Sequence, residues 1–576
     1  MNRRELLTAL PISLATSQVM AAPLASPRAL SARGEANIVA LARLVAALRF
    51  FHPSDEAAEA DWDALVVETI EAVEEAQTSK TLAEKLDAAF RGVAPTMELR
   101  TSAGGLVRLA SPPPTDGRRV RWSHRGARLV SDVAPIFASV RMYAEEGASS
   151  LWSLDLGAGV FAAIPTAVVG TPGAKVTLDL TQARAVAKRH APEDRRARLA
   201  AVVLLWGAME HFFPYFDESG CDWSRELSKG LRAAAMDGDG QQFHRTLMRM
   251  VASLRDAHAN VYYFSGPLLP IGWDVVEGRL AVTATPVGGA SGLLVGDVIT
   301  RMDGVDIRQR LAEMESLVSA PTPQWLRFKA LQLLQERLDS SVAVLEGDGA
   351  KGTAFTARLA PIAPREAMAV TLRYAQPNLS EVRPGVVYVD LSRITANDFS
   401  ANIDRLRAAN GLVVDDRGYP TTGANAFLTH LITKPVNSHI NEYLTVEAFD
   451  RPRKTSVTNP FTINPAPTPF PGRAVMLTGG GSMSWGETCA LFFSAGAVGK
   501  IVGGPTAGTN GVINRFVLPG GYSVVYSGTR VLKADGSKNQ GVGVQPDILV
   551  ATTLSGLRAR RDEVLERGGA LAAREA

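Results

Sequence analysis

The residues best suited to do chemistry lie in the stretch 473–496, RAVMLTGGGSMSWGETCALFFSAG. Its apolar run 474–477 predicts a buried strand, three glycines allow a tight turn, and 488–495 predicts a buried helix. Ser484 stands where that turn enters the helix, beside unbonded N–H groups and the positive end of the helix dipole. Such groups stabilise the oxyanion that forms when a serine attacks a carbonyl. We interpret Ser484 as a candidate nucleophile; the alternative is that it only caps the helix.

The composition excludes several other kinds of function. The chain has 576 residues, of which 46% are hydrophobic and 21% charged, with a net charge of +3. No basic cluster carries interleaved aromatic residues, so we expect no nucleic-acid partner. Cys221 and Cys489 are the only cysteines, which excludes a disulfide framework and a thiolate metal site. The eight histidines lack HExxH spacing, so we predict no metal and no cofactor.

The N-terminus predicts export. Arg3 and Arg4 precede an apolar segment that ends in small residues near Ala21. We interpret residues 1–21 as an export signal of the twin-arginine type; the alternative is a tail with chance arginines. No later apolar run reaches the roughly 18 residues that span a bilayer. We therefore expect a periplasmic or extracellular protein with no stable membrane span once the signal is removed.

A helical pattern occurs twice in the first half of the chain. The sequences FHP at 51–53 and DW at 61–62 correspond to FFP at 212–214 and DW at 222–223, at one offset of 161 (214−53 and 223−62). Equal spacing of two such matches predicts a duplicated module. The second copy alone ends in Asp256-Ala257-His258, so we expect the first copy to be structural.

The whole pattern predicts a multidomain α+β protein. Short β-type runs separated by Gly and Pro predict a small β-sandwich between the helical copies, and alternating strands and helices predict a βα-layered core at the end. The predicted domains are an export signal (1–21), a linker (22–35), helical copy 1 (36–96), a β-sandwich-like domain (97–190), helical copy 2 (195–265), a PDZ-like domain with a helical insertion (270–365) and a catalytic core (380–576).

Four motifs in order resemble the carboxyl-terminal-processing (tail-specific) serine peptidases. They are VDDRGYPTTG, SMSWGE, GGPTAGTNG and DGSKNQGVGVQPDI, and the resemblance covers about residues 200–575. The SASE motif of that family carries the nucleophile three residues before its Glu, which corresponds to Ser484 before Glu487 here. The resemblance implies a PDZ-like module ahead of a crotonase/ClpP-like catalytic core, and a protein or peptide substrate.

Two departures favour the tricorn-like branch of that family. Thr509 stands where many members carry a lysine base, so a Ser–Lys dyad in its usual place is excluded. The tricorn-like branch uses a histidine ahead of the PDZ module, which is the position of His258. It also carries a Glu shortly before the GVxPD motif, where this chain has Gln540. We expect Gln540 to orient His258 by accepting from its ring N–H, with Asp535 as another candidate for that role.

The resemblance implies a specific division of roles. Ser484 attacks a peptide carbonyl, and His258 takes its proton and returns it to the leaving amine. The backbone N–H of Trp485 donates to the oxyanion, with a second donor from Gly418 or Tyr419. The alternative for His258 is a structural partner of a helix end. The alternative for the whole chain is a catalytically weak or inactive peptide-binding scaffold. The sequence leaves the oligomeric state open.

Overall fold

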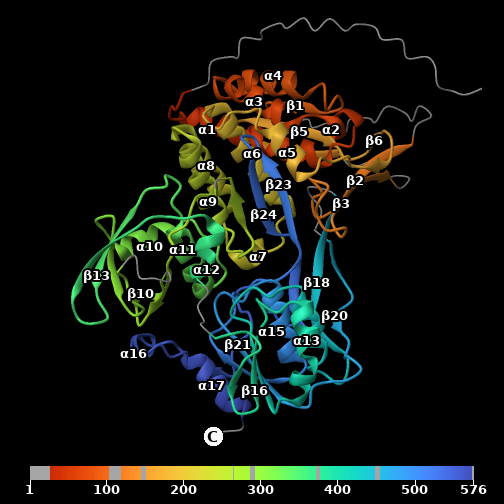
Figure 1. Ribbon diagram of the computed structural model, residues 1–576. Coiled ribbons are helices and arrows are strands. Elements are labelled where there is room, and N and C mark those ends of the chain that lie inside the picture. Colours follow the sequence, from red (N-terminus) through yellow and green to blue (C-terminus); the bar gives the residue numbers. More distant parts are fainter. Residues whose placement is uncertain are drawn as a thin grey trace, which may run out of the picture.

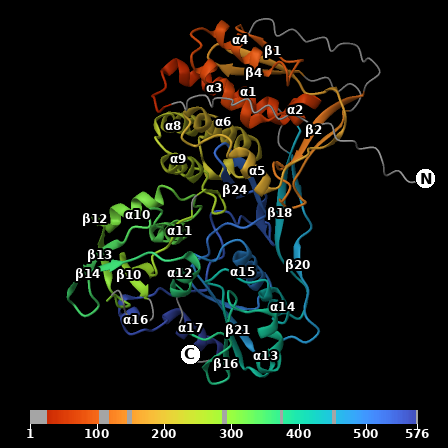
Figure 2. The ribbon, with the colours of Figure 1, turned by 45° about the horizontal axis from the view of Figure 1, so that its top comes forward.

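The computed structural model describes residues 26–102, 118–144, 151–263, 265–285, 292–371, 376–447 and 454–573 (Figure 1). The predicted export signal at 1–21 lies outside these ranges. Figures 1 and 2 show the N-terminal helices at one end of the molecule and the C-terminal sheet at the other, with the green module of residues 270–365 beside them. Among the described residues, no helix has both the length and the apolar character needed to cross a membrane.

The described chain has nine helices between residues 32 and 252. They are α1 (Ala32–Phe51), α2 (Asp55–Glu59), α3 (Trp62–Glu74), α4 (Ser79–Phe90), α5 (Leu180–Ala187), α6 (Arg195–Phe212), α7 (Phe216–Ser219), α8 (Trp223–Met236) and α9 (Gly240–Ala252). The two DW motifs begin equivalent helices, because Asp61 caps α3 and Asp222 caps α8 through their side chains.

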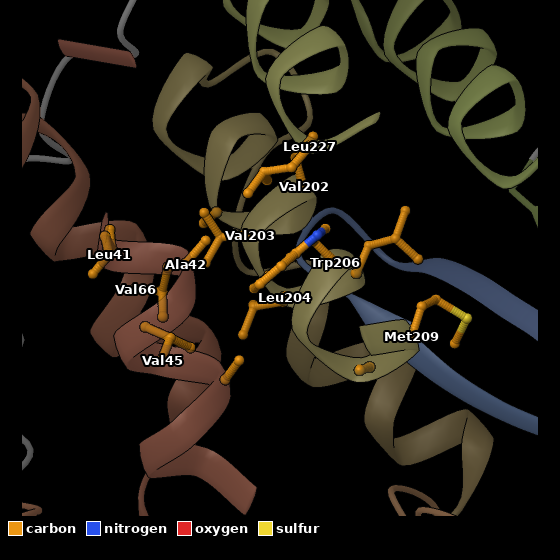
Figure 3. Packing of buried hydrophobic residues seen from close by; sticks show 14 of the residues in the cluster. Leu41, Ala42, Val45, Val66, Val202, Val203, Leu204, Trp206, Met209 and Leu227 are labelled. Atoms are coloured by element: carbon orange, nitrogen blue, oxygen red, sulfur yellow. The ribbon is translucent and has the colours of Figure 1, made fainter. Parts of the chain in front are cut away.

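The largest hydrophobic core lies where α1 and α6 meet. Figure 3 shows Val45 of α1 facing Val203 and Leu204 of α6, with Val66 of α3 beside them. All four side chains are almost completely buried. Both helices are apolar on most of their surface, which is typical of helices enclosed by neighbours on several sides.

The strands between the two helical groups do not form a self-contained sandwich. The strands β1 (Glu98–Arg100), β4 (Leu151–Gly157) and β5 (Val160–Pro165) make one small sheet, in the order β1-β5-β4. A second sheet joins β2 (Arg119–Arg125), β3 (Ala138–Tyr143), β6 (Val168–Val169) and β7 (Gly173–Ala174) to strands from the C-terminal part, which are β18 (Val436–Val446), β19 (Lys454–Val457), β20 (Phe461–Ile463) and β25 (Arg530–Lys533). The predicted domain at 97–190 is therefore divided between two sheets, because β2 pairs with β18 rather than with β4.

A separate module follows the second helical group. Its sheet has the order β14-β13-β11-β10-β9, with β12 on β11. The strands are β9 (Gly272–Val276), β10 (Arg279–Ala284), β11 (Val298–Met302), β12 (Val305–Asp306), β13 (Ala343–Asp348) and β14 (Ala354–Leu359). Two helices, α10 (Ile307–Glu315) and α11 (Pro323–Gln335), are inserted between β12 and β13, and α12 (Pro364–Thr371) follows. This is where the sequence predicts a helical insertion.

The C-terminal core is a six-stranded sheet of order β15-β16-β17-β21-β22-β26, parallel from β16 onward. Its strands are β15 (Glu381–Arg383), β16 (Val386–Asp390), β17 (Gly411–Asp415), β21 (Arg473–Thr478), β22 (Gly499–Gly503) and β26 (Ile548–Leu549). Its helices are α13 (Ala396–Ala408), α14 (Gly423–Thr429), α15 (Trp485–Ala495), α16 (Leu554–Arg558) and α17 (Glu563–Ala572). Every residue of β16 and β17 is buried, as expected for parallel strands covered on both faces.

A three-stranded sheet connects the N-terminal helices to this core. Its order is β23-β24-β8, with β23 (Ile513–Leu518), β24 (Tyr522–Ser527) and β8 (Asn260–Tyr262). In Figure 1 the β23–β24 hairpin extends from the core toward the N-terminal helices. Because β8 follows His258 directly in the chain, this pairing brings the upstream histidine to the core.

Candidate active site

Ser484 lies at the turn between β21 and α15, as predicted from the sequence. Its backbone has φ 54° and ψ −111°, a conformation that costs a non-glycine residue about 1–3 kcal/mol. Hydrogen bonds hold it there: the Ser484 N–H donates to the Thr509 carbonyl at 2.9 Å, and the Thr488 N–H donates to the Ser484 carbonyl at 2.9 Å. The Ser484 side chain makes no capping bond to the helix. A role as a simple cap therefore has no support in this geometry.

His258 reaches the same cavity through the pairing of β8 with β24. The antiparallel register pairs Asn260 with Val525, and continuing it by two pairs puts His258 opposite Ser527. Ser484 and His258 both line a cavity of about 490 Å³. The two residues come from positions 226 apart in the chain (484−258), and this strand pairing helps to bring them to one place.

The side chains of His258, Ser527 and Asp256 form a hydrogen-bonded chain that begins at the imidazole. His258 Nδ1 is 2.8 Å from Ser527 Oγ, and the Ser527 hydroxyl donates to Asp256 Oδ1 at 2.7 Å. Asp256 also accepts from the Ser527 backbone N–H at 2.7 Å and from the His258 backbone N–H at 3.1 Å. Asp256 is completely buried. The carboxylate therefore holds both the strand end and the histidine loop.

The other ring nitrogen of His258 is unbonded. Nε2 is buried and has no hydrogen-bond partner among the described residues, so no Ser484–His258 hydrogen bond is formed. Catalytic bonds of this kind are often long without substrate. Burial lowers the pKa of His258, and the nearby Asp256 carboxylate opposes that effect. The imidazole is therefore neutral near pH 7, which is the state that a general base requires.

Gln540 does not orient His258, and that expectation is corrected. The Gln540 side-chain oxygen accepts from Thr509 Oγ1 at 3.0 Å, and its amide donates to the Arg255 carbonyl at 3.1 Å. Asp535 is exposed and accepts from the Ser537 N–H. The reason is geometric: the β24 register brings Ser527, not the loop before GVQPD, to Nδ1 of His258. Sequence reasoning missed Ser527 because no local motif marks it, and the only signal for Asp256 was its spacing from His258.

The candidate oxyanion donors lie at the start of α15 and in the loop after β17. Tyr419 lines the 490 Å³ cavity with Ser484, whereas Gly418 lines a neighbouring cavity of about 240 Å³. Within the described residues, no hydrogen bond to a protein acceptor uses the backbone N–H of Gly418, Tyr419 or Trp485. These three N–H groups are therefore available to an incoming oxygen.

Arg417 fixes the loop that carries Gly418 and Tyr419. Its guanidinium donates to Asp415 at 2.9 and 2.6 Å and to Asp562 at 3.0 and 2.9 Å. Burial pushes the pKa of Asp415 up, but Arg417 outweighs it and holds this pKa below its usual value. Arg417 is thus a structural clamp for this loop.

Glu487, in the first turn of α15, binds the loops that contain Thr506, Gly508 and Asn539. Its fully buried carboxylate accepts from Thr506 Oγ1 at 2.5 Å, from the Gly508 N–H and from Asn539 Nδ2 at 2.7 Å. Burial raises the pKa of Glu487, and these hydrogen bonds oppose the rise. The described residues hold no group of three or more His, Cys, Asp or Glu side chains suited to a metal ion.

A hydroxyl at a helix N-terminus, a neutral buried imidazole in the same cavity and unbonded N–H groups nearby define a site of the serine-hydrolase class. Residues 385–550 match peptidase family S41. This match covers part of the C-terminal core and agrees with the resemblance to carboxyl-terminal-processing serine peptidases.

The fold is similar to solved structures. Mature CPAF complexed with lactacystin matches with a TM-score of 0.54 and 15% identity, over 66% of this chain and 98% of that chain. Mature CPAF in a second crystal structure matches with a TM-score of 0.53 and 14% identity, over 66% and 96% of the two chains. At these identities the likeness concerns the fold alone. A comparison with curated protein sequences found no match.

Proposed function

We propose that this protein is a serine endopeptidase in which Ser484 is the nucleophile and His258 the general base. The observation that carries the proposal is the shared cavity: Ser484, with its strained backbone, and His258, whose Nε2 has no hydrogen-bond partner among the described residues, line it together. Nε2 takes the hydroxyl proton as Oγ attacks the peptide carbonyl, and returns it to the leaving amine. This transfer requires Nε2 and Oγ to come within hydrogen-bonding distance of each other when substrate binds.

The developing oxyanion is stabilised by backbone donors. The Trp485 N–H lies at the N-terminus of α15, where the helix dipole adds partial positive charge. The N–H of Gly418 or Tyr419 supplies the second bond. Arg417, through its two aspartate partners, keeps this second loop in position while the substrate enters.

An extended peptide fits the path to the site. The cavity that contains Ser484 shares Asn260, Tyr262 and Lys329 with a larger one of about 820 Å³, so the two cavities lie side by side. β8 is an edge strand of its sheet and borders both cavities. A substrate segment added beside β8 would be hydrogen-bonded through its backbone and led toward Ser484.

The finer domain assignments belong to the same proposal. We interpret residues 270–365 as a PDZ-like module that delivers or gates C-terminal protein segments, and the two helical groups as a duplicated scaffold. The equivalent aspartate caps of α3 and α8 support the duplication. The use of His258 as the base, with Thr509 at the position of the usual lysine, favours the tricorn-like branch. The N-terminal sequence favours export to the periplasm or the extracellular space.

A fluorophosphonate probe tests the proposal directly. We expect the wild-type protein to be labelled and Ser484→Ala to be unlabelled, because the probe reacts only with an activated hydroxyl. Ser482→Ala is a matched control, since Ser482 lies two residues away but its hydroxyl donates to the Asp416 carbonyl and lies outside the cavity. An unlabelled wild-type protein would refute the peptidase and favour the peptide-binding scaffold.

A further inference from the structure

We propose that Ser527 is a positioning residue which relays a hydrogen bond between Asp256 and His258. The relay fixes the imidazole tautomer that has its proton on Nδ1 and its lone pair on Nε2. This inference rests on the proposed function, in which Nε2 takes the proton of Ser484. It assigns a role to a serine that no sequence motif marks.

The proton count of the Ser527 hydroxyl carries the argument. A hydroxyl has one hydrogen and can donate only once. Both carboxyl oxygens of Asp256 accept from backbone N–H groups, Oδ2 from Ser527 and Oδ1 from His258. Asp256 is therefore the acceptor toward the Ser527 hydroxyl, whose hydrogen points to Oδ1 at 2.7 Å. The 2.8 Å contact from Ser527 Oγ to Nδ1 can then only be a bond that His258 donates. The proton is therefore on Nδ1, and Nε2 carries the lone pair.

The relay also explains how a carboxylate can support His258 without touching its ring. The Asp256 side chain bonds the His258 backbone and the Ser527 hydroxyl, and the hydroxyl bonds the ring. When the ring takes a proton, the positive charge is stabilised through this hydroxyl. Cooperative chains of this kind strengthen each bond in a low-dielectric interior. Among the described residues, Ser527 is the one side chain bonded to the His258 ring.

Two substitutions separate the relay from simple packing. Ser527→Ala removes the acceptor for Nδ1–H, whereas Ser527→Thr keeps a hydroxyl. Ser523→Ala is the control on the same strand, because Ser523 is also buried but its hydroxyl accepts from Arg184, away from His258. Asp256→Asn keeps the shape but offers an amide hydrogen to Ser527, which would turn the hydroxyl toward the ring and favour the wrong tautomer.

The measurement is the second-order rate of fluorophosphonate labelling between about pH 5 and 9. We expect Ser527→Ala and Asp256→Asn to be slower by roughly 10²-fold or more, with Ser527→Thr recovering most of the rate. The acidic limb should move to lower pH in both slow variants, because the protonated ring loses its support. The other titratable groups that face this cavity, Lys329 of α11, Tyr262 of β8 and Tyr419, are the same in every variant.

Two results of the labelling experiment would overturn the relay. One is a Ser527→Ala protein with the wild-type rate and acidic limb. The other is a Ser527→Thr protein that is as slow as Ser527→Ala while its thermal unfolding matches that of the wild type. The tautomer is also read without any activity, from ¹⁵N chemical shifts of the His258 ring. A proton on Nε2 in the wild type would refute the relay, whereas absent labelling with the proton on Nδ1 would refute only the peptidase.

Discussion

Two neighbouring carboxyl groups at the end of β17 have opposite environments. Asp415 is paired with Arg417 and also accepts from the Tyr388 hydroxyl at 2.7 Å. Asp416 is fully buried, and among the described residues neither of its carboxyl oxygens has a hydrogen-bond partner. Burial first, and then the negative charges of Asp415 and Glu487, raise the pKa of Asp416 well above its usual value. The folded protein therefore favours the protonated form of Asp416 over the carboxylate more strongly than the unfolded chain does.

This difference predicts a pH-dependent stability. The pKa of Asp416 is higher in the folded than in the unfolded chain. The stability that its protonated carboxyl adds to the folded protein is therefore complete below about pH 4, and it is lost as the pH rises through the folded pKa. Asp416→Asn cannot ionise. The difference between its free energy of unfolding and that of the wild type should therefore shift in favour of the variant by up to about 1.4 kcal/mol for each pH unit in that window. Urea unfolding at several pH values measures this. Asp404→Asn, at an exposed position, is the control, and parallel pH curves for wild type and Asp416→Asn would contradict the assignment.

At the scale of elements, the loop after β22 connects the nucleophile to the histidine segment. The Thr509 carbonyl accepts from the Ser484 N–H, and its hydroxyl both accepts from the Ala257 N–H and donates to Gln540. We expect Thr509→Val to lower the free energy of unfolding by about 1–3 kcal/mol, because buried polar partners lose their bonds. Probe labelling should fall as well. Thr509→Ser keeps the hydroxyl and should behave as the wild type; a stable, fully reactive Thr509→Val would show that this connection is dispensable.

The contact between α1 and α6 depends on a residue without a side chain. A Cβ added at Gly207 of α6 would lie 3.0 Å from the Cβ of Ala46 in α1. Gly207→Leu should therefore force the helices apart and lower the free energy of unfolding by at least about 1–3 kcal/mol. Gly92→Ala is the matched control, since a Cβ at Gly92 meets nothing within 4 Å. Equal thermal stability of the two variants would mean that the helices can move apart at no cost.

At the scale of the whole molecule, the N-terminal region and the peptidase core are one structure. β2 pairs with β18, β8 pairs with β24, and Arg195 of α6 donates to Glu74 of α3 at 2.6 and 2.9 Å. A chain that begins at residue 191 would lose α1 and α3 and expose the apolar face of α6. The described residues between 26 and 190 are therefore part of the folding unit rather than a detachable addition.

A truncation tests this unity. We expect a protein that begins at residue 191 to aggregate or to unfold without cooperativity in urea, because apolar surface buried against α1 is left in water. A protein that begins at residue 26 keeps every contact described for residues 26–573 and is the control. Size-exclusion chromatography distinguishes the two. A monomeric, probe-reactive protein lacking residues 1–190 would show that the core folds alone.

Local sequence determined the parts of this protein whose signals are short in range. The apolar run, glycines and helix around Ser484 predicted the strand–turn–helix that the structure contains. Both DW motifs, which lie in segments predicted as helical modules, stand at helix starts. The inserted helices after β12 were also predicted. In each case hydrophobic periodicity, capping and turn chemistry act over fewer than about twenty residues, so one sequence is enough to read them.

Only the tertiary structure decided which distant residues meet. The register of β8 on β24 selects Ser527 and not Gln540 as the partner of the His258 ring, and a shift of one residue would turn the ring to the other face. The pairing of β2 with β18 divided a region that local patterns predicted as one sandwich. Strand pairing across hundreds of residues depends on the packing of the complete core, and no local pattern carries that information.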